Sequence, residues 1–321
     1  MTNNLRTVSS HAVIDGPSHV DEAPIFLTGF ARSGTTWVNR LMRDYFDAGF
    51  VNEGQFILAF GSRITRYGDL HTVRCRARFL KDLAKDEFFS ILARNYKVQI
   101  DWTGVLEDTQ SFSEIVKSIL LQITQQTGKR RIGSKYPMFG RHLNLLNALF
   151  PDCRVIHVVR DGRDCALSHK RVVWGHQNTY SAAVHWRHYI EIARCHSIDL
   201  SDRYLEIRYE DLLMESEKTM RILEHFITGT YKYGIAERFV TDKALLKTDR
   251  IGRWRKEMPV GSQALFEYVA GDMLEACGYP LTRLAQKPSL AAKAGYMLHD
   301  RLTREGWNIA RKVFPNISER K

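Results

Sequence analysis

The segment GFARSGTTW, residues 29–37, joins a glycine-bearing turn to the start of a predicted helix and follows a short apolar strand. Free backbone N–H groups and the positive end of the helix dipole meet at such a turn, so it can bind an anion. A nucleoside-triphosphate P-loop reads GxxxxGK[ST], and its lysine contacts the β- and γ-phosphates. Here Gly29 and Gly34 have the P-loop separation, but Thr35 stands at the lysine position, and Arg32 is the only cation of the loop. The loop therefore predicts a phosphate ligand without a γ-phosphate.

Charged side chains stand at the ends of other predicted strands. Glu53, Lys135 and Arg160 each close a short apolar or alternating run, and Arg160 begins the sequence RDGR. In an open α/β sheet, ligands bind outside the carboxyl ends of the strands. Cations that converge on one such crevice favour a multiply charged nucleotide, because guanidinium groups bind phosphate oxygens bidentately. Each of these residues alone could be an ordinary surface residue, so the prediction depends on their conjunction.

The elements that must position these residues follow an α/β order. Runs typical of strands alternate with runs typical of helices from residue 24 onward, and this order predicts a central parallel sheet with helices on both faces. Residues 55–125 are helix-rich and aromatic. We expect strands that end at Thr28 and at residues 50–51, 131–135, 155–159 and 205–209, and helices at 35–46, 220–227 and 265–274.

The two ends of the chain differ from the middle. Residues 1–22 lack periodicity and are expected to form a mobile N-terminal arm, which leaves residues 23–284 as the main domain. Residues 285–321 carry eight Lys and Arg against three acidic residues, with apolar residues at roughly helical spacing. This segment predicts either a helix that packs on the domain or a basic amphipathic surface for a membrane or an acidic acceptor.

Composition narrows the class of protein. The 321 residues have a net charge of +11, which implies an anionic partner: a nucleotide, a nucleic acid, an acidic substrate or a membrane surface. The five cysteines are scattered and never form CxxC, which argues against a disulfide framework and a zinc site. The first 23 residues contain no apolar core of a signal peptide, and no apolar run approaches the ~18 residues of a membrane span. We expect a cytoplasmic protein.

Four motifs together resemble one family. GFARSGTTW, VVRDGRDCALS, RYEDL and IGRWR have the order and spacing of the sulfotransferases, which transfer sulfuryl groups from 3′-phosphoadenosine 5′-phosphosulfate (PAPS). The resemblance covers residues 24–280 and implies a P-loop-like α/β fold. PAPS has a 5′-phosphosulfate and a 3′-phosphate but no γ-phosphate, which agrees with the missing lysine. The resemblance assigns the 5′-phosphosulfate to the loop residues Arg32, Ser33, Gly34, Thr35 and Thr36.

The same resemblance assigns the rest of the nucleotide. Arg160 and Ser168, eight residues apart, match the arginine and the serine that bind the 3′-phosphate. Tyr209 of RYEDL matches a tyrosine near the adenine, although a core aromatic residue would fit that position equally well. Arg253 of IGRWR matches a basic residue that reaches the 3′-phosphate from a late loop. The fuller glycine pattern of this loop is absent, so the alternatives Lys247, Arg250 and Arg255 stay open.

The residue that removes the acceptor's proton differs between branches of the family. Cytosolic small-molecule sulfotransferases carry a histidine two residues before a proline, and Lys135 of SKYP occupies that position here. Protein-tyrosine sulfotransferases carry a lysine there and a glutamate 21 residues after the loop arginine, which corresponds to Glu53. The resemblance therefore implies Glu53 as the general base, with Lys135 and Arg32 stabilising the departing phosphate oxygen. A surface glutamate in a turn is the alternative for Glu53, and the reserve candidates for the base are His169, His176, His185 and His188.

The resemblance implies in-line attack of an acceptor hydroxyl or amine on sulfur, with adenosine 3′,5′-bisphosphate (PAP) as the leaving group and no metal ion in the reaction. We expect residues 55–125 and 174–186 to shape the acceptor pocket. A carbohydrate, a lipid or a secondary metabolite could be the acceptor. The alternatives are a P-loop kinase and a basic nucleic-acid-binding protein. Thr35 argues against the first, and the lack of aromatic residues interleaved with basic ones argues against the second, so we expect no nucleic-acid partner.

Overall fold

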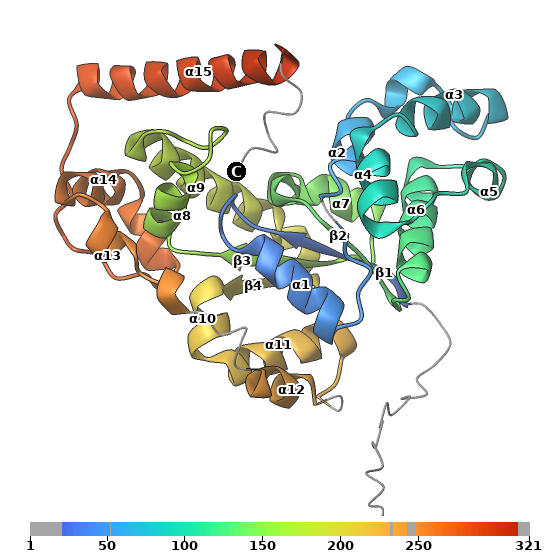
Figure 1. Cartoon of the computed structure of the whole chain (residues 1–321), viewed down its shortest axis with the longest axis horizontal. Coiled ribbons are helices and arrows are strands. Elements are labelled where there is room, and N and C mark those ends of the chain that lie inside the picture. The colour runs from blue at the N-terminus through green and yellow to red at the C-terminus, as the bar shows by residue number, and fades with distance from the viewer. Residues whose placement is uncertain (1–20, 52, 232–233, 243–247, 314–321) are drawn as a thin grey trace, which may run out of the picture.

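The computed structural model describes residues 21–51, 53–231, 234–242 and 248–313. These residues form a four-stranded sheet in the order β2-β1-β3-β4, and every pairing is parallel. The predicted α/β fold with a central parallel sheet is confirmed (Figure 1). The strands are β1 (Asp21–Thr28), β2 (Arg131–Lys135), β3 (Arg154–Val159) and β4 (Tyr204–Arg208).

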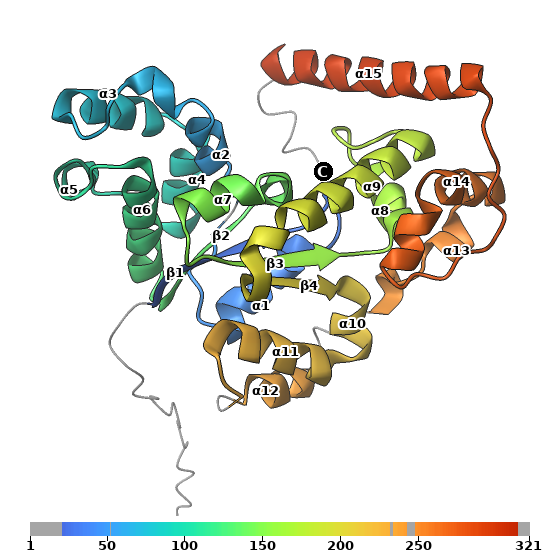
Figure 2. The same ribbon diagram turned by 180° about the vertical axis from the view of Figure 1, so that it is seen from behind.

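Helices cover both faces of the sheet. Ile25 and Leu27 of β1 share a buried cluster with α1, α10, α11 and α12, whereas Phe26 between them belongs to a second cluster on the opposite face. Figures 1 and 2 show α1 on one face and α7 and α9 on the other. The helices are α1 (Thr35–Tyr45), α7 (Leu143–Leu149), α8 (Gly162–His169), α9 (Thr179–His196), α10 (Tyr209–Met214), α11 (Ser216–Thr228), α12 (Ile235–Thr241), α13 (Trp254–Glu257) and α14 (Val260–Ala276).

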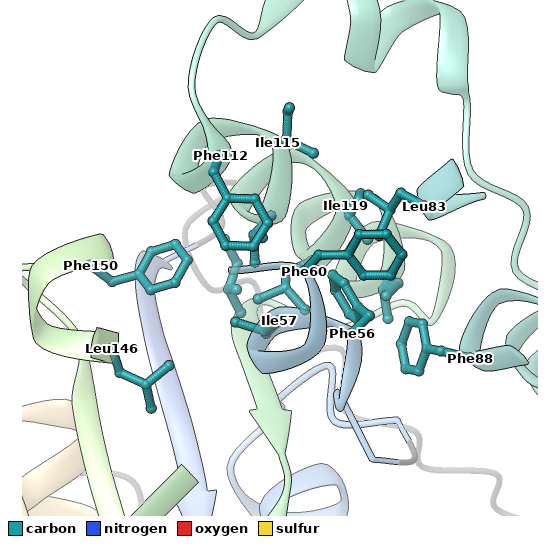
Figure 3. Close-up of a cluster of buried hydrophobic side chains, with 14 of the residues drawn as sticks. Phe56, Ile57, Phe60, Leu83, Phe88, Phe112, Ile115, Ile119, Leu146 and Phe150 are labelled. Carbon is teal, nitrogen blue, oxygen red and sulfur yellow. The ribbon is translucent and has the colours of Figure 1, made fainter. Parts of the chain in front are cut away.

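The aromatic stretch predicted between residues 55 and 125 is a helical unit beside β2. Side chains next to three of its helices cap their N-termini. Asp86 and Asp101 each accept hydrogen bonds from first-turn N–H groups, and Ser111 forms a capping box with Glu114. Phenylalanines from several of these helices meet in one buried cluster (Figure 3). The unit contains α2 (Phe56–Gly61), α3 (Val73–Leu83), α4 (Glu87–Tyr96), α5 (Trp102–Asp108) and α6 (Phe112–Gln126).

The strand predicted at residues 50–51 is wrong. The chain forms a single bridge, between Ala48 and Arg131, and then passes over the edge of β2. The ring of Phe50 lies over Gly133, where an added Cβ would come within 2.1 Å of it. The Phe50 N–H bonds back to Ala48 instead of continuing a ladder. Packing of one aromatic ring over a glycine thus replaces strand pairing. The run predicted to end at 209 also stops one residue early, because Tyr209 begins α10.

The C-terminal helix α15 (Leu290–Val313) extends along one side of the molecule and contacts α9 (Figure 1). Tyr296 stacks on Tyr180 with ring centroids 5.6 Å apart, and the Tyr296 carbonyl accepts from Asn178. Leu298 and Leu302 are more than half exposed. The helix therefore packs through one face and presents apolar residues on another. The predicted arm, residues 1–22, lies mostly outside the described residues, and β1 begins at Asp21. Among the described helices, none is both long and apolar enough to cross a membrane.

Candidate active site

Lys135 and Glu53 form an ion pair at the carboxyl end of β2. Lys135 Nζ lies 2.9 Å from Glu53 Oε1, and the lysine side chain is 6% exposed whereas the glutamate is 45% exposed. The Gly54 N–H donates to the Lys135 carbonyl, which holds the two segments side by side. An added Cβ on Gly54 would lie 2.1 Å from Ser134 Oγ, so a larger residue would force this buried hydroxyl to turn away. A half-exposed carboxylate is thereby presented next to a buried ammonium.

The loop before α1 has the backbone of an anion site. Arg32 has φ of 72° and Gly34 has φ of 91°, both in the left-handed region. An added Cβ on Gly34 would come within 2.4 Å of the Tyr209 ring, so glycine lets the loop close against α10. Among the described residues, no side chain caps the first turn of α1. First-turn N–H groups such as those of Thr35 and Thr36 are the donors that a phosphate-binding turn would use.

The Arg32 side chain joins the loop to α8. Its Nε donates to Ser168 Oγ at 2.9 Å, and its guanidinium lies 6.0 Å from the centre of the Trp174 ring. Burial, with the nearby charges of Arg160 and Arg250, lowers the pKa of Arg32. Ser168 is predicted to bind the 3′-phosphate together with Arg160, and in this structure its hydroxyl accepts from Arg32. The serine therefore also positions the side chain of the loop arginine.

Arg160 is buried where the loops after β1 and β3 meet. Its Nη1 donates to the Arg32 carbonyl at 3.3 Å and its Nη2 to the Arg250 carbonyl at 2.6 Å. Its guanidinium lies 4.7 Å from the centre of the Tyr209 ring. The Arg160 Nε is buried without a hydrogen-bond partner among the described residues. A buried donor of this kind favours an anionic ligand, because an unpaired N–H costs about 1–3 kcal/mol.

Tyr209 packs beside Gly34 and Arg160. The side chain is 6% exposed, and its ring meets Trp37 edge to face with centroids 5.7 Å apart. Burial raises the pKa of its phenol. Tyr209 thus lies beside Gly34 and Arg160 and is both a core residue of its cluster and a wall of the predicted nucleotide site.

The late loop contacts Arg160 through the Arg250 carbonyl, whereas the Arg253 side chain pairs with Glu257. The backbone N–H groups of Gly252 and Trp254 donate to Asp164, at 2.8 and 2.9 Å, and hold the loop on α8. Arg253 forms two hydrogen bonds to Glu257, at 2.6 and 2.8 Å.

The alternatives named for Arg253 occupy different places. Arg250 contributes its carbonyl to Arg160, and the guanidinium of Arg255 lies 4.5 Å from the centre of the Trp254 ring. Lys247 lies outside the described residues.

The reserve histidines have other partners. His169 Nε2 lies 3.1 Å from the Ala31 carbonyl, and its Nδ1 accepts from the His176 N–H at 3.3 Å. Burial lowers the pKa of His169 to about 3, so the ring is neutral at pH 7 with both nitrogens engaged. His188 is exposed on α9, 3.9 Å from Glu191. His176 and His185 contact Asp300 on α15.

Tyr189 is a positioning residue that sequence reasoning missed. Its hydroxyl bonds to Thr28 Oγ1 at 2.8 Å, accepts from the Gly29 N–H at 3.1 Å and donates to the Pro137 carbonyl at 2.6 Å. It therefore ties the start of the loop of residues 29–36 to the segment after Lys135. Nothing in the local sequence distinguishes this tyrosine from other aromatic residues of α9.

The order of the strands explains why the predicted cations converge. Arg32 follows β1, Lys135 ends β2 and Arg160 follows β3, and these strands are direct neighbours in the sheet. Neighbouring strands are ~4.8 Å apart, so the carboxyl ends of the three strands lie within about 10 Å of one another. Arg160 also donates directly to the Arg32 carbonyl. The sheet thus presents three cations and one carboxylate at one edge, which suits a ligand with several anionic groups.

Comparisons with known proteins agree with this geometry. A profile described as the sulfotransferase family matches residues 24–231. The chain is similar to protein-tyrosine sulfotransferase 1 of Danio rerio, with 28% identity over 256 residues that make up 76% of this chain and 65% of that protein. It is also similar to protein-tyrosine sulfotransferase 2 of Gallus gallus, with 24% identity over 303 residues, 88% of this chain and 75% of that protein.

Solved structures share the fold. The sulfotransferase domain from the olefin synthase of Synechococcus PCC 7002 aligns with a TM-score of 0.50 and 21% identity, over 83% of this chain and 98% of that one. The sulfotransferase domain from the curacin biosynthetic pathway aligns with a TM-score of 0.50 and 16% identity, over 81% of this chain and 98% of that one. The family profile spans more than half of the sequence and includes the loop of residues 29–36, Lys135 and Arg160. The chain therefore belongs to the sulfotransferase family.

Proposed function

We propose that this protein transfers a sulfuryl group from PAPS to a hydroxyl or amine of an acceptor. The proposal depends on one arrangement: Arg32, Lys135 and Arg160 stand at the carboxyl ends of three neighbouring strands. Glu53 joins them, with its Oε1 2.9 Å from Lys135 Nζ. Family membership supports sulfuryl transfer, and the absence of a lysine at Thr35 favours a donor without a γ-phosphate.

Each part of the donor has a group that suits it. The N–H groups at the start of α1, with Arg32, would bind the 5′-phosphosulfate. Arg160, whose Nε is buried without a described partner, would bind the 3′-phosphate, and Tyr209 would lie against the adenine. Arg253 could join the 3′-phosphate only after its pair with Glu257 opens. The donor itself can open that pair, since a phosphate replaces one anion with another.

The reaction would use the Lys135–Glu53 pair. Glu53 would accept the acceptor's proton while the acceptor oxygen or nitrogen forms its bond to sulfur. The bond between sulfur and the bridging phosphate oxygen would break, and PAP would leave with that electron pair. Lys135 and Arg32 would stabilise the charge that develops on this oxygen. The protein then contributes mainly position and charge, as in phosphoryl transfer. The protein's own residues supply each of these steps, and we propose that no metal ion takes part.

The acceptor would enter between the helical unit of residues 56–126 and the Glu53 carboxylate. Tyr136 lies close enough to this carboxylate to feel its charge: burial raises the pKa of the Tyr136 phenol, and the Glu53 charge adds to the rise. The relatives are named for tyrosine sulfation, so a tyrosine phenol belongs among the candidate acceptors. Carbohydrate, lipid and secondary-metabolite hydroxyls complete the set, because the apolar residues of this unit would accept several kinds of molecule.

Donor binding and transfer are tested separately. We expect PAP to raise the melting temperature of the protein more than ATP with Mg²⁺ does, because ligand that binds the folded state stabilises it. We then expect labelled PAPS to sulfate at least one member of a panel of phenols, carbohydrates, lipids and peptides. Protection by ATP with Mg²⁺ but not by PAP would overturn the donor assignment and favour a P-loop kinase.

A further inference from the structure

Three potential metal ligands meet where α15 lies against α9. His176 comes from the turn before α9, His185 from the helix itself and Asp300 from α15. His176 Nδ1 lies 3.1 Å from Asp300 Oδ1, and His185 Nε2 lies 3.7 Å from Asp300 Oδ2. One ligand atom from each residue lies within 4.8 Å of the other two. Small shifts of these side chains would bring all three to one ion.

The burial of Asp300 is unusual for its helix. Asp300 is 5% exposed, whereas Leu298 and Leu302 on either side of it are 57% and 58% exposed. The helix thus turns a carboxylate toward the protein and leaves leucines in solvent. Burying an ionised carboxylate is unfavourable unless cations or strong donors compensate it, so the contact must satisfy Asp300 well.

The two imidazoles are arranged to share this carboxylate. Their rings stack with centroids 4.3 Å apart and planes 12° from parallel, and a nitrogen of each faces an Asp300 oxygen. Two protonated rings at this distance would repel each other. A single divalent ion could replace the protons between both rings and the carboxylate, and two imidazoles with one carboxylate are a donor set for Zn²⁺ and related ions.

The other groups around the cluster are compatible with a bound ion. Arg304 Nε lies 3.6 Å from Asp300 Oδ2, but its side chain is half exposed and can turn into solvent. The His169 ring lies 5.1 Å from the His176 ring, but the Ala31 carbonyl and the His176 N–H engage both of its nitrogens. The His185 side chain is 32% exposed, which leaves one side open to a water ligand and to entry of the ion.

We propose that His176, His185 and Asp300 bind a divalent transition-metal ion of the Zn²⁺ type, which fastens α15 to the rest of the protein. The proposal is independent of the donor and the acceptor. The ion would lie behind the donor loop, because the His176 N–H contacts His169 and His169 contacts the Ala31 carbonyl. Its role is structural, since its three ligands join α15 to α9 and its turn, whereas Lys135 and Glu53 pair with each other.

The test uses untagged full-length protein that has been stripped of metal with a chelator. We expect Co²⁺ to bind in a 1:1 ratio and to give visible absorption bands, and Zn²⁺ to displace it. At 100 times its Kd, Zn²⁺ should raise the melting temperature by about 5 °C. Asp300→Asn and His185→Gln should each lower the affinity for the ion by more than ~10–100-fold, which is the typical effect of losing an outer hydrogen-bond partner of a ligand.

His188→Gln is the matched control, because His188 is an exposed histidine of the same helix. It should bind Co²⁺ like the parent protein. If Asp300→Asn fails to fold, His185→Gln decides the outcome through the absorption bands. Absence of a 1:1 complex in the parent protein would overturn the proposal, and so would equal binding by His185→Gln. Either result would leave a hydrogen-bonded His–Asp cluster at this contact.

Discussion

Arg160 and Arg163 are neighbours in the sequence RDGR, but their guanidinium groups lie in regions of opposite character. Arg163 is fully buried between α8 and α14, where Asp161 accepts two hydrogen bonds from its side chain, at 3.0 and 2.8 Å. Glu267 accepts a third at 2.8 Å, and the Trp254 ring centre lies 3.6 Å away. Arg160 has carbonyl partners and an Asp164 oxygen 3.8 Å away.

The difference separates structural charges from charges available to a ligand. Carboxylates and an aromatic ring satisfy Arg163, so any other anion would have to displace them. The buried Nε of Arg160 has no described partner, and this residue faces loops that also carry Arg32 and Arg250. Burial alone therefore does not identify a functional arginine. The identity of its partners does.

Arg163→Met should have the largest effect on stability. The change leaves the carboxylates of Asp161 and Glu267 buried without their cation, and breaking a buried ion pair costs about 3–5 kcal/mol. Urea unfolding of the variant should show this loss as a lower midpoint. Arg160→Met is the matched control and should lose much less stability. Similar losses for both variants would contradict the comparison.

Glu53→Gln should lower the turnover rate by a factor of ~10²–10⁴ and leave the affinity for PAP unchanged, because glutamine keeps the shape of the side chain but cannot accept the proton. Initial rates with PAPS and calorimetric titration with PAP measure the two quantities separately. Glu107→Gln on α5 is the control, since Glu107 is an exposed glutamate of the helical unit. Near-normal turnover of Glu53→Gln would mean that another group is the base.

Arg160→Ala should abolish the preference for PAPS over adenosine 5′-phosphosulfate, which lacks the 3′-phosphate. Hydrogen bonds to charged groups contribute ~1.5–3 kcal/mol each, so the parent protein should discriminate on the order of 10²-fold. Binding of both donors to both proteins isolates the contact. An equal loss for the two donors would assign Arg160 to the fold or to the 5′ side.

Ser168→Ala sharpens this measurement. If Ser168 binds the 3′-phosphate as the resemblance implies, the variant should lose affinity for PAPS alone. If it mainly positions Arg32, with which it forms a 2.9 Å hydrogen bond, both donors should be weakened. The present geometry favours the second result.

Glu206→Gln tests a carboxylate whose partners, His157 and Arg194, belong to the fold and not to the predicted ligand site. Burial alone would raise the pKa of Glu206, but hydrogen bonds from His157 and Arg194 outweigh it and lower the pKa from 4.5 to about 2. A lowered native pKa gives stability that is present above the unfolded value and is lost as the pH falls toward the native one. The free energy of unfolding of the parent protein should therefore exceed that of the variant by about 3 kcal/mol at pH 7.

That difference should shrink between pH 4.5 and about 2, as urea unfolding at several pH values would show. A constant difference across this range would mean that Glu206 does not titrate between the folded and unfolded states.

Local patterns were enough to predict the main elements and the ends of the strands. β3 is a largely apolar run, and the glycines at 29 and 34 favour a turn, so the positions of Arg32 and Arg160 follow from residues next to them. The placement of Glu53 and Lys135 in one site was predicted through resemblance alone, and their ion pair was not predicted. Their separation of 82 residues carries no local signal, and the segment between them folds as its own helical unit.

The wrong strand prediction has a physical cause. Phe50 resembles a strand residue because β-propensity describes a fit to a half-buried surface, and packing over Gly133 provides such a surface without a ladder. Arg253 stays a predicted residue of the 3′-phosphate site, but Glu257, one helical turn away, forms two hydrogen bonds with it and would compete with the phosphate. Such a partner was visible in the sequence as an i, i+4 pair.

By itself the sequence determined which residues end the strands and begin the helices, because hydrophobic periodicity, glycine and capping residues act within a few positions. Only the tertiary structure decided which of those ends meet. The strand order β2-β1-β3 places Lys135, Arg32 and Arg160 together, and Tyr189 ties two loops that lie more than 100 residues apart. Asp300 meets His185 because α15 packs on α9. These contacts depend on how whole faces of the molecule pack, and no short stretch of sequence encodes that packing.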